Sequence, residues 1–280
     1  MRVGIGLPSA IPGTPAERIV EWARRADEGP FSSVGVLDRI VYDSFDPLVS
    51  LTAAAAVTSQ IKLVTMVVIG PLRNAAVLAK EAASLNAMSG GRFVLGLGIG
   101  ARAEDYTASG LETRNRGQRF AEQLLALKTY WEDDRVGPHS GPPRRPLLLA
   151  GGQSGEAFGR MARYADGYVH GGGPPRAFAG AASRARAAWS ELGRPGRPPL
   201  WGQGYFALGA DAESAGAEYL RHYYAFTGPF AEKVAAANLT TPQAVIDFVR
   251  GYEEAGCDEL VLLPTVADPT QLDRLADVIG

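Results

Sequence analysis

The chain has 280 residues, a hydrophobic fraction of 46% and a formal net charge of −2. That length suits a single α/β barrel, which takes roughly 250 residues, and the interspersed charges give no basic surface for a nucleic acid. The only cysteine, Cys257, excludes a disulfide within the chain, and the three histidines are too scattered for a metal site.

Eight short apolar segments predict β-strands, because apolar and β-branched residues suit strands that are buried on both faces. In chain order these strands span 3–7, 33–37, 62–69, 93–95, 147–150, 167–170, 200–208 and 259–263. Segments with apolar residues at helical spacing follow the strands. The clearest of these helices span 47–58, 76–88, 156–164 and 176–192.

The alternation of strand and helix predicts a parallel sheet with right-handed crossovers. Eight such units predict a closed (β/α)8 TIM barrel, formed by a single domain over 1–280. A helical insertion at 211–238 follows the seventh strand and is too long for a simple loop. It falls over the barrel mouth, where its aromatic residues either pack together or form a lid. A Pro- and Gly-rich loop at 137–146 is interpreted as an excursion within the domain.

The fourth strand runs into glycines at alternate positions, Gly96, Gly98 and Gly100, and Arg102 follows them closely. Glycine lets a backbone approach a ligand or adopt a positive φ, and arginine is well suited to bind a phosphate. The stretch therefore fits the phosphate of a cofactor. A tight turn beside a solvated arginine explains the glycines equally well.

The fifth strand is followed by Gly151, Gly152 and Ser154 at the start of a helix. Backbone amides and a hydroxyl at a helix N-terminus can bind a phosphate, although an ordinary N-cap has the same composition. The spacing does not match the G-x-S-x-G elbow of serine hydrolases. The alternate glycines of the fourth strand likewise do not match the dinucleotide pattern G-x-G-x-x-G.

Three candidate catalytic residues lie at strand ends, which in a barrel form its working face. Asp38 and Arg39 end the second strand, and His170 ends the sixth. Asp38 and Arg39 either form a buried ion pair at the barrel rim or act on a substrate. His170 is either an ordinary loop histidine or a catalytic residue.

Two long segments and the opening VGIGLP resemble the luciferase-like monooxygenases, the barrel family of bacterial luciferase and the coenzyme F420-dependent oxidoreductases. The segments are LRNAAVLAKEAASLNAMSGGRFVLGLGIG, at 72–100, and LLLAGGQSGEAFGRMARYADGYV, at 147–169. The resemblance covers essentially the whole chain. It implies that a reduced FMN or deazaflavin binds at the C-terminal mouth of the barrel.

The resemblance also implies which residues hold the cofactor. Arg102 matches an arginine that contacts the flavin phosphate, and Gly151, Gly152 and Ser154 match the phosphate loop. The third strand end, Met66–Val67, matches a segment that runs under the flavin ring and often holds a non-proline cis peptide.

The chain departs from the family at the second strand, where many relatives carry an acid and a histidine. Asp38 supplies the acid, but Arg39 occupies the histidine position. Arginine cannot act as a general base near neutral pH, although it can hold an anionic substrate or stabilise a developing oxyanion. Luciferase-type proton chemistry and light emission are therefore not expected.

The resemblance implies a flavin-dependent oxidoreductase, and we expect a monooxygenase that uses reduced FMN and O₂ on a small organic substrate. No NAD(P) fingerprint is visible, so a separate flavin reductase is expected to supply the FMN. The alternative is a coenzyme F420-dependent reductase or dehydrogenase, which transfers hydride on the same scaffold. A non-catalytic flavin-binding protein is the third hypothesis, because the histidine is missing.

Helices 47–58 and 76–88 carry many alanines and few charges, although the outer face of a barrel helix should be polar. Because family members commonly pair through these helices, we expect a homodimer. The N-terminus lacks a basic region followed by a long apolar run, and no stretch of roughly 18 apolar residues exists. We therefore expect a cytoplasmic protein without a membrane span.

Overall fold

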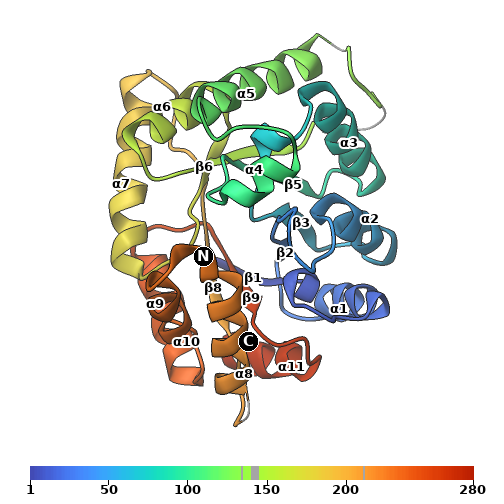
Figure 1. The fold of residues 1–280 in the computed structure, drawn as a ribbon, viewed down its shortest axis with the longest axis vertical. Helices are drawn as coiled ribbons and strands as arrows, with labels where there is room; N and C mark the ends of the chain where they lie inside the picture. Colours follow the sequence, from blue (N-terminus) through green and yellow to red (C-terminus); the bar gives the residue numbers. More distant parts are fainter. Residues whose placement is uncertain (134, 140–144, 211) are drawn as a thin grey trace.

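The structure is a computed structural model that describes residues 1–133, 135–139, 145–210 and 212–280. Within these residues, nine β-strands pair in parallel in the order β3-β2-β1-β9-β8-β7-β6-β5-β4, and β3 also pairs with β5, which closes the sheet. Because β3 and β4 share one position, the barrel has eight strand positions, and helices surround it (Figure 1). The predicted TIM barrel is confirmed.

Each predicted strand is present. The strands are β1 (Arg2–Gly6), β2 (Ser33–Val36), β3 (Lys62–Thr65), β4 (Val68–Ile69), β5 (Phe93–Gly98), β6 (Leu147–Gly151), β7 (Gly167–Val169), β8 (Leu200–Phe206) and β9 (Glu259–Pro264). The α-helices are α1 (Ala16–Glu28), α2 (Pro47–Val57), α3 (Ala75–Met88), α4 (Ala103–Ala108), α5 (Arg116–Glu132), α6 (Gly155–Tyr164), α7 (Pro175–Glu191), α8 (Ala212–Tyr223), α9 (Phe230–Ala236), α10 (Pro242–Glu254) and α11 (Thr270–Ile279). Short 3₁₀ helices are η1 (Pro8–Ala10), η2 (Gly70–Leu72) and η3 (Ala225–Thr227).

The third predicted strand is interrupted in the structure. The peptide bond Met66–Val67, between β3 and β4, is cis, as the family resemblance implied. Leu63 pairs with Phe93, and Val68 pairs with Leu97. Between these two pairs, the β3–β4 segment advances five residues, from 63 to 68, whereas β5 advances four, from 93 to 97. The additional residue forms a β-bulge, which divides the single predicted strand at 62–69 into β3 and β4.

The barrel interior is a packed core, because side chains along each strand alternate between the inside of the barrel and the surrounding helices. The inner cluster consists of the buried residues Val64, Met66, Val94, Leu149, Val169, Trp201, Val261 and Leu263. A filled barrel leaves ligand binding to the segments at the C-terminal strand ends.

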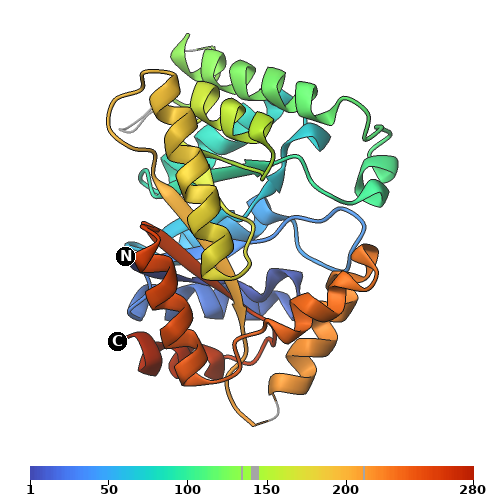
Figure 2. The ribbon, with the colours of Figure 1, turned by 90° about the vertical axis from the view of Figure 1, so that its left-hand side faces the viewer.

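The predicted insertion is helical and lies at the barrel mouth. It comprises α8, η3 and α9, and Leu239 then returns to the edge of β8, where its amide donates to the Tyr205 carbonyl at 3.0 Å. Figure 2 shows these helices (orange) on the same side as the short green helix α4, opposite both termini. Asp211, and residues 140–144 of the predicted loop, lie outside the described residues. Among the described residues, no helix has the length and apolarity that crossing a membrane requires.

Arg92 connects α2, β3 and α3 at the opposite end of the barrel. Its guanidinium donates to the carbonyl oxygens of Ser89 at 2.8 Å, Ile61 at 2.8 Å and Thr58 at 3.0 Å. We expect Arg92→Ala to lower the free energy of unfolding by roughly 2 kcal/mol, because three charge-assisted contacts to backbone carbonyls are lost. Urea unfolding measures this change. An unchanged midpoint would show that solvent replaces these contacts without cost.

Candidate active site

The candidate residues lie at the C-terminal strand ends. Asp38 and Arg39 follow β2, the Met66–Val67 bond lies between β3 and β4, and His170 follows β7. The other candidates lie at the ends of β5 and β6 or at the helix starts that follow: Gly98, Gly100, Arg102, Gly151, Gly152 and Ser154. The barrel therefore brings all of them to one face, although their side chains do not all point to one place.

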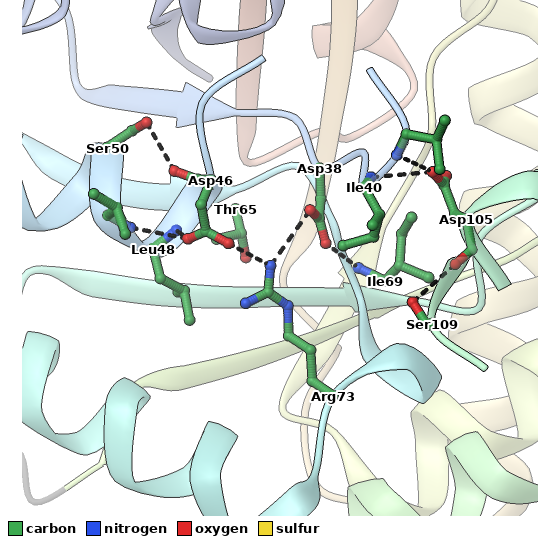
Figure 3. A network of polar contacts seen from close by, with 12 residues as sticks. Asp38, Ile40, Asp46, Leu48, Ser50, Thr65, Ile69, Arg73, Asp105 and Ser109 are labelled. Atoms are coloured by element: carbon green, nitrogen blue, oxygen red, sulfur yellow. Dashed lines mark hydrogen bonds and ion pairs between the residues drawn. The ribbon is translucent and has the colours of Figure 1, made fainter. Parts of the chain in front are cut away.

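Asp38 points away from the mouth into a polar network behind β2. Its carboxylate accepts from the Ile69 amide at 2.9 Å and lies 3.4 Å from Arg73, which also pairs with Asp46 at 2.7 Å (Figure 3). Burial raises the pKa of Asp38, and the positive charge of Arg73 partly offsets this effect. The network ties β4 and η2 to the segment after β2.

A buried ion pair between Asp38 and Arg39, one of the two interpretations of these residues, is not present. Adjacent residues of an extended chain point to opposite sides, so Asp38 faces the helices while Arg39 faces the mouth. Arg39 forms its ion pair with Glu104 of α4, and its side chain is only 5% exposed. Its guanidinium carbon lies 4.3 Å from the centre of the Tyr42 ring.

Arg102 is buried among aromatic residues of the insertion. Its guanidinium carbon lies 4.6 Å from the ring centre of Tyr223 and 4.4 Å from that of Phe226. The Tyr223 carbonyl, at the C-terminal end of α8, accepts from Arg39 at 3.3 Å and from Arg102 at 3.4 Å. The insertion thus contacts both arginines through one backbone oxygen.

No carboxylate of the described residues forms an ion pair with Arg102, whose exposure is 8%. The Nε atoms of Arg39 and Arg102 are buried and lack a hydrogen-bond partner in the described part of the chain. A buried cation is costly unless an anion pairs with it. Arg102, which lacks such a partner among the described residues, is therefore chemically suited to an anionic ligand, whereas Arg39 is already paired with Glu104.

Asp105 holds the segment after β2 against α4. Its side chain is fully buried and accepts from the amides of Ile40 at 3.0 Å and Val41 at 2.8 Å (Figure 3). The carboxylate thereby fixes the backbone next to Arg39. Nothing in the local sequence indicates that Glu104 and Asp105 meet the segment after the second strand, because these contacts join residues 65 positions apart.

The glycines of β5 make room for the neighbouring strand. A Cβ atom on Gly98 would lie 2.8 Å from Cγ2 of Val67, and one on Gly100 would lie 2.6 Å from Cγ2 of Ile69. Gly100 also has a φ of +69°, which glycine adopts without strain. The packing of Val67 and Ile69 thus accounts for these glycines, and a phosphate bed is not required to explain them.

The loop after β6 forms an N-cap and also exposes helix amides. The Ser154 hydroxyl accepts from the Ala157 amide at 3.2 Å, and Gly152 has a φ of +133°. Gly155 and Glu156 open the first turn of α6, where backbone N–H groups have no partner within the helix. The arrangement retains the capacity to bind an anion at those amides.

His170 is packed outside the barrel interior. Val169 belongs to the inner cluster, so His170 points to the helices, where its ring centre lies 5.7 Å from that of Phe178. Its exposure is 1%, and burial lowers its pKa to about 4. This position favours a packing role over proton transfer, and we assign His170 no part in the proposed chemistry.

The His170 environment predicts a pH dependence of stability. The folded pKa of about 4 lies below the ordinary 6.5, so the unfolded chain binds more protons in this window. The free energy of unfolding should therefore fall by about 2–4 kcal/mol from this group as the pH drops from 6.5 to 4. Urea unfolding at several pH values tests this, with His170→Gln as the comparison. Equal slopes for both proteins would contradict the buried neutral state.

A tyrosine–histidine pair beside Arg39 was missed by sequence reasoning. The Tyr42 hydroxyl lies 2.9 Å from Nδ1 of His222, which belongs to α8. Burial raises the pKa of Tyr42, and the charges of Arg39 and Arg102 oppose that rise. These groups can exchange a proton through their hydrogen bond. Residues 180 positions apart gave no sequence signal for this contact.

Comparison with known proteins gives one family. Residues 1–248 match the family described as luciferase-like monooxygenase. An F420-dependent glucose-6-phosphate dehydrogenase from Kineococcus radiotolerans is 36% identical over 129 residues, which cover 42% of this chain and 38% of that protein. The matches span about half or less of the length of the curated relatives.

Solved structures share the fold along the whole chain. An F420-dependent secondary alcohol dehydrogenase, in complex with an F420–acetone adduct, has a TM-score of 0.84 at 18% identity, and the match covers 99% of this chain and 98% of that one. The oxygenating constituent of 3,6-diketocamphane monooxygenase from Pseudomonas putida, in complex with FMN, has a TM-score of 0.76 at 17% identity, covering 100% and 96%. At such identities the likeness shows a common barrel.

Proposed function

The chain belongs to the luciferase-like monooxygenase family, and we propose that it is an oxidoreductase that binds a reduced, phosphorylated flavin or deazaflavin at the barrel mouth. The observation that carries this proposal is Arg102, a buried cation without a carboxylate partner among the described residues. The phosphate of such a cofactor supplies the missing anion.

Several residues of the mouth fit the two ends of that cofactor. Arg102 and the amides of Gly155 and Glu156 would hold the phosphate. The bulge at Met66–Val67 would lie against the ring system. When bound, the cofactor supplies either hydride or, as reduced FMN, the reaction with O₂.

Arg39 and its neighbours would bind the substrate and act on it. Glu104 and the Tyr42 ring hold the Arg39 guanidinium in place, so its donors can orient a carbonyl or carboxylate oxygen of a small-molecule substrate. The Tyr42–His222 pair lies next to it and can take up or release a proton. Together they replace the acid–histidine pair of many relatives.

Between the two cofactors, we put F420 and hydride transfer first. The partial relative at 36% identity is an F420-dependent dehydrogenase, which favours this choice over the FMN expected from the sequence. Oxygenation with reduced FMN and O₂, supplied by a separate reductase, is the second candidate, because the matching family is described as a monooxygenase.

Fluorescence titration of the purified protein with F420, FMN and reduced FMN tests the proposal. Tight F420 binding with no affinity for either FMN form would support hydride transfer. Tight binding of reduced FMN alone would move oxygenation to first place. A protein that binds none of the three would overturn the proposed function, and one that binds but turns over no substrate would be a flavin-binding protein.

We also propose a homodimer through the outer faces of α2 and α3. Val49, Val77 and Met88 are 66%, 55% and 66% exposed on these neighbouring helices, where a second copy would bury them. Light scattering at micromolar concentration should give a dimer mass, and Val77→Lys should give a monomer. Leu125→Lys, at an exposed position on α5, is the control and should leave the dimer intact. A wild-type monomer would contradict this proposal.

A further inference from the structure

A cleft separates the first turns of α5 and α6, which lie side by side on the mouth side of the barrel (Figure 1). Its volume is about 460 Å³, which is within the usual range for ligand clefts. Its lining includes Gly117 and Ala121 of α5 and Gly155, Gly159 and Arg160 of α6. Because so many of these residues are small, the cleft reaches the helix backbones.

The two glycines of α6 are not required by packing. A Cβ atom on Gly155 or Gly159 would meet no atom within 4 Å, and neither residue has a positive φ. Glycine inside a helix costs about 1 kcal/mol relative to alanine. The two residues are four apart, so they leave one continuous strip of α6 open to the cleft. This free space is what a ligand lying along the helix would use.

The charge of the cleft is positive. Arg160 and Arg163 line it, the Arg160 side chain is only 13% exposed, and its Nε atom has no hydrogen-bond partner among the described residues. The one acid in the lining, Glu156, is 88% exposed and lies 4.0 Å from Arg160. The N-terminal ends of both α5 and α6 add partial positive charge. The cleft therefore suits an anion that extends over some length.

The cleft adjoins the proposed binding site of the cofactor phosphate. Gly155 belongs both to the cleft lining and to the helix start that would hold the phosphate. A chain attached to that phosphate would enter the cleft directly. FMN ends at its phosphate, whereas F420 continues through a lactyl group into a chain of glutamates.

We infer that the cleft between α5 and α6 binds an anionic, carboxylate-bearing extension of the cofactor beyond its phosphate, the chemistry of the F420 glutamate chain. The inference rests on the proposed function and extends it to the choice of cofactor. FAD also carries a charged extension, but its adenine ring seeks a stacking surface, and no aromatic residue is among the described residues that line the cleft.

Titration of the full chain with four cofactors tests this inference: F420 with several glutamates, the F420 form that lacks glutamate, FMN and FAD. We expect the glutamylated form to bind roughly tenfold or more tightly than the form without glutamate. The double variant Arg160→Ala/Arg163→Ala should abolish that difference, and Gly159→Leu should do so by filling the cleft while favouring the helix. Both variants should bind FMN and glutamate-free F420 within about twofold of wild type. Lys128→Ala, on α5 outside the cleft, is the control.

The outcomes separate this inference from the proposed function. If glutamate-free F420 and FMN bind but the glutamate chain adds no affinity, the inference is wrong and the proposed function stands. If FAD, and not glutamylated F420, loses affinity in the double variant, the cleft binds an adenylate and the inference is wrong. If none of the four cofactors binds, both fail.

Discussion

Replacing Arg102 with methionine should weaken binding of the phosphorylated cofactor roughly tenfold or more. The guanidinium is buried and has no carboxylate partner among the described residues, so its charge is available for a phosphate. Methionine fills a similar volume and keeps apolar contact with Phe226, which lies against the arginine in the structure. The change therefore removes the charge while largely preserving the packing.

Two comparisons separate phosphate binding from a general loss of structure. Riboflavin, which lacks the phosphate, should bind wild type and Arg102→Met within about twofold of each other, because the charge contacts only the phosphate. Arg135→Met, an exposed arginine paired with Asp133, is the matched control and should leave all affinities unchanged. An unchanged dissociation constant for FMN and F420 in Arg102→Met would remove this residue from the site.

The sequence was sufficient for the barrel, because its signal is local and repeated. Each strand is a short apolar run, and several of the following helices begin at a recognisable side-chain cap, such as Asp46 before α2 or Asn74 before α3. The sequence did not predict that the bulge at Met66–Val67 interrupts the third strand, because the segment 62–69 is almost continuously apolar. The short helix α4 was missed because six residues show no helical period.

The site was predicted only in part, because its contacts join distant segments. The alternation of side chains along a strand could have separated Asp38 from Arg39, but which acid would meet Arg39 depends on how α4 packs against β2. The local sequence pattern also could not predict that Arg39 and Arg102 both donate to the Tyr223 carbonyl. That contact depends on how the insertion folds back over the mouth. Patterns in the sequence thus located the strand ends, and tertiary packing decided which side chains face one another.

The carbonyl at the end of α8 suggests how the insertion and the mouth are coupled. The C-terminal end of a helix carries partial negative charge, and the Tyr223 oxygen presents it to two guanidinium groups. An anion that reaches Arg39 or Arg102 therefore competes with this oxygen. The placement of Arg39 is thus sensitive both to substrate and to the insertion, which makes it the most informative residue for mutation.

Arg39→Lys should damage turnover nearly as much as Arg39→Ala, by roughly 10- to 100-fold in kcat/KM. A planar guanidinium can contact Glu104 and the Tyr223 carbonyl while it stacks on Tyr42, and a lysine ammonium cannot reproduce this fork. Cofactor affinity should stay within about twofold in both variants, because Arg102 and the start of α6 hold the phosphate. Cofactor titration and steady-state kinetics with a substrate identified by screening measure the two quantities.

A structural role for Arg39 predicts a different pattern. In that case the residue serves mainly to join α4 to the segment after β2, and Glu104→Gln, which weakens the same ion pair, should reproduce the defects of Arg39→Ala. Under the substrate-orienting role, Glu104→Gln leaves the guanidinium present and should cost far less turnover than Arg39→Ala. Asp38 does not complicate the comparison, because it keeps Arg73 and the Ile69 amide as partners when Arg39 is changed. A melting temperature several degrees lower in Arg39→Ala, together with weaker cofactor binding, would assign Arg39 to the structure of the mouth and not to the reaction.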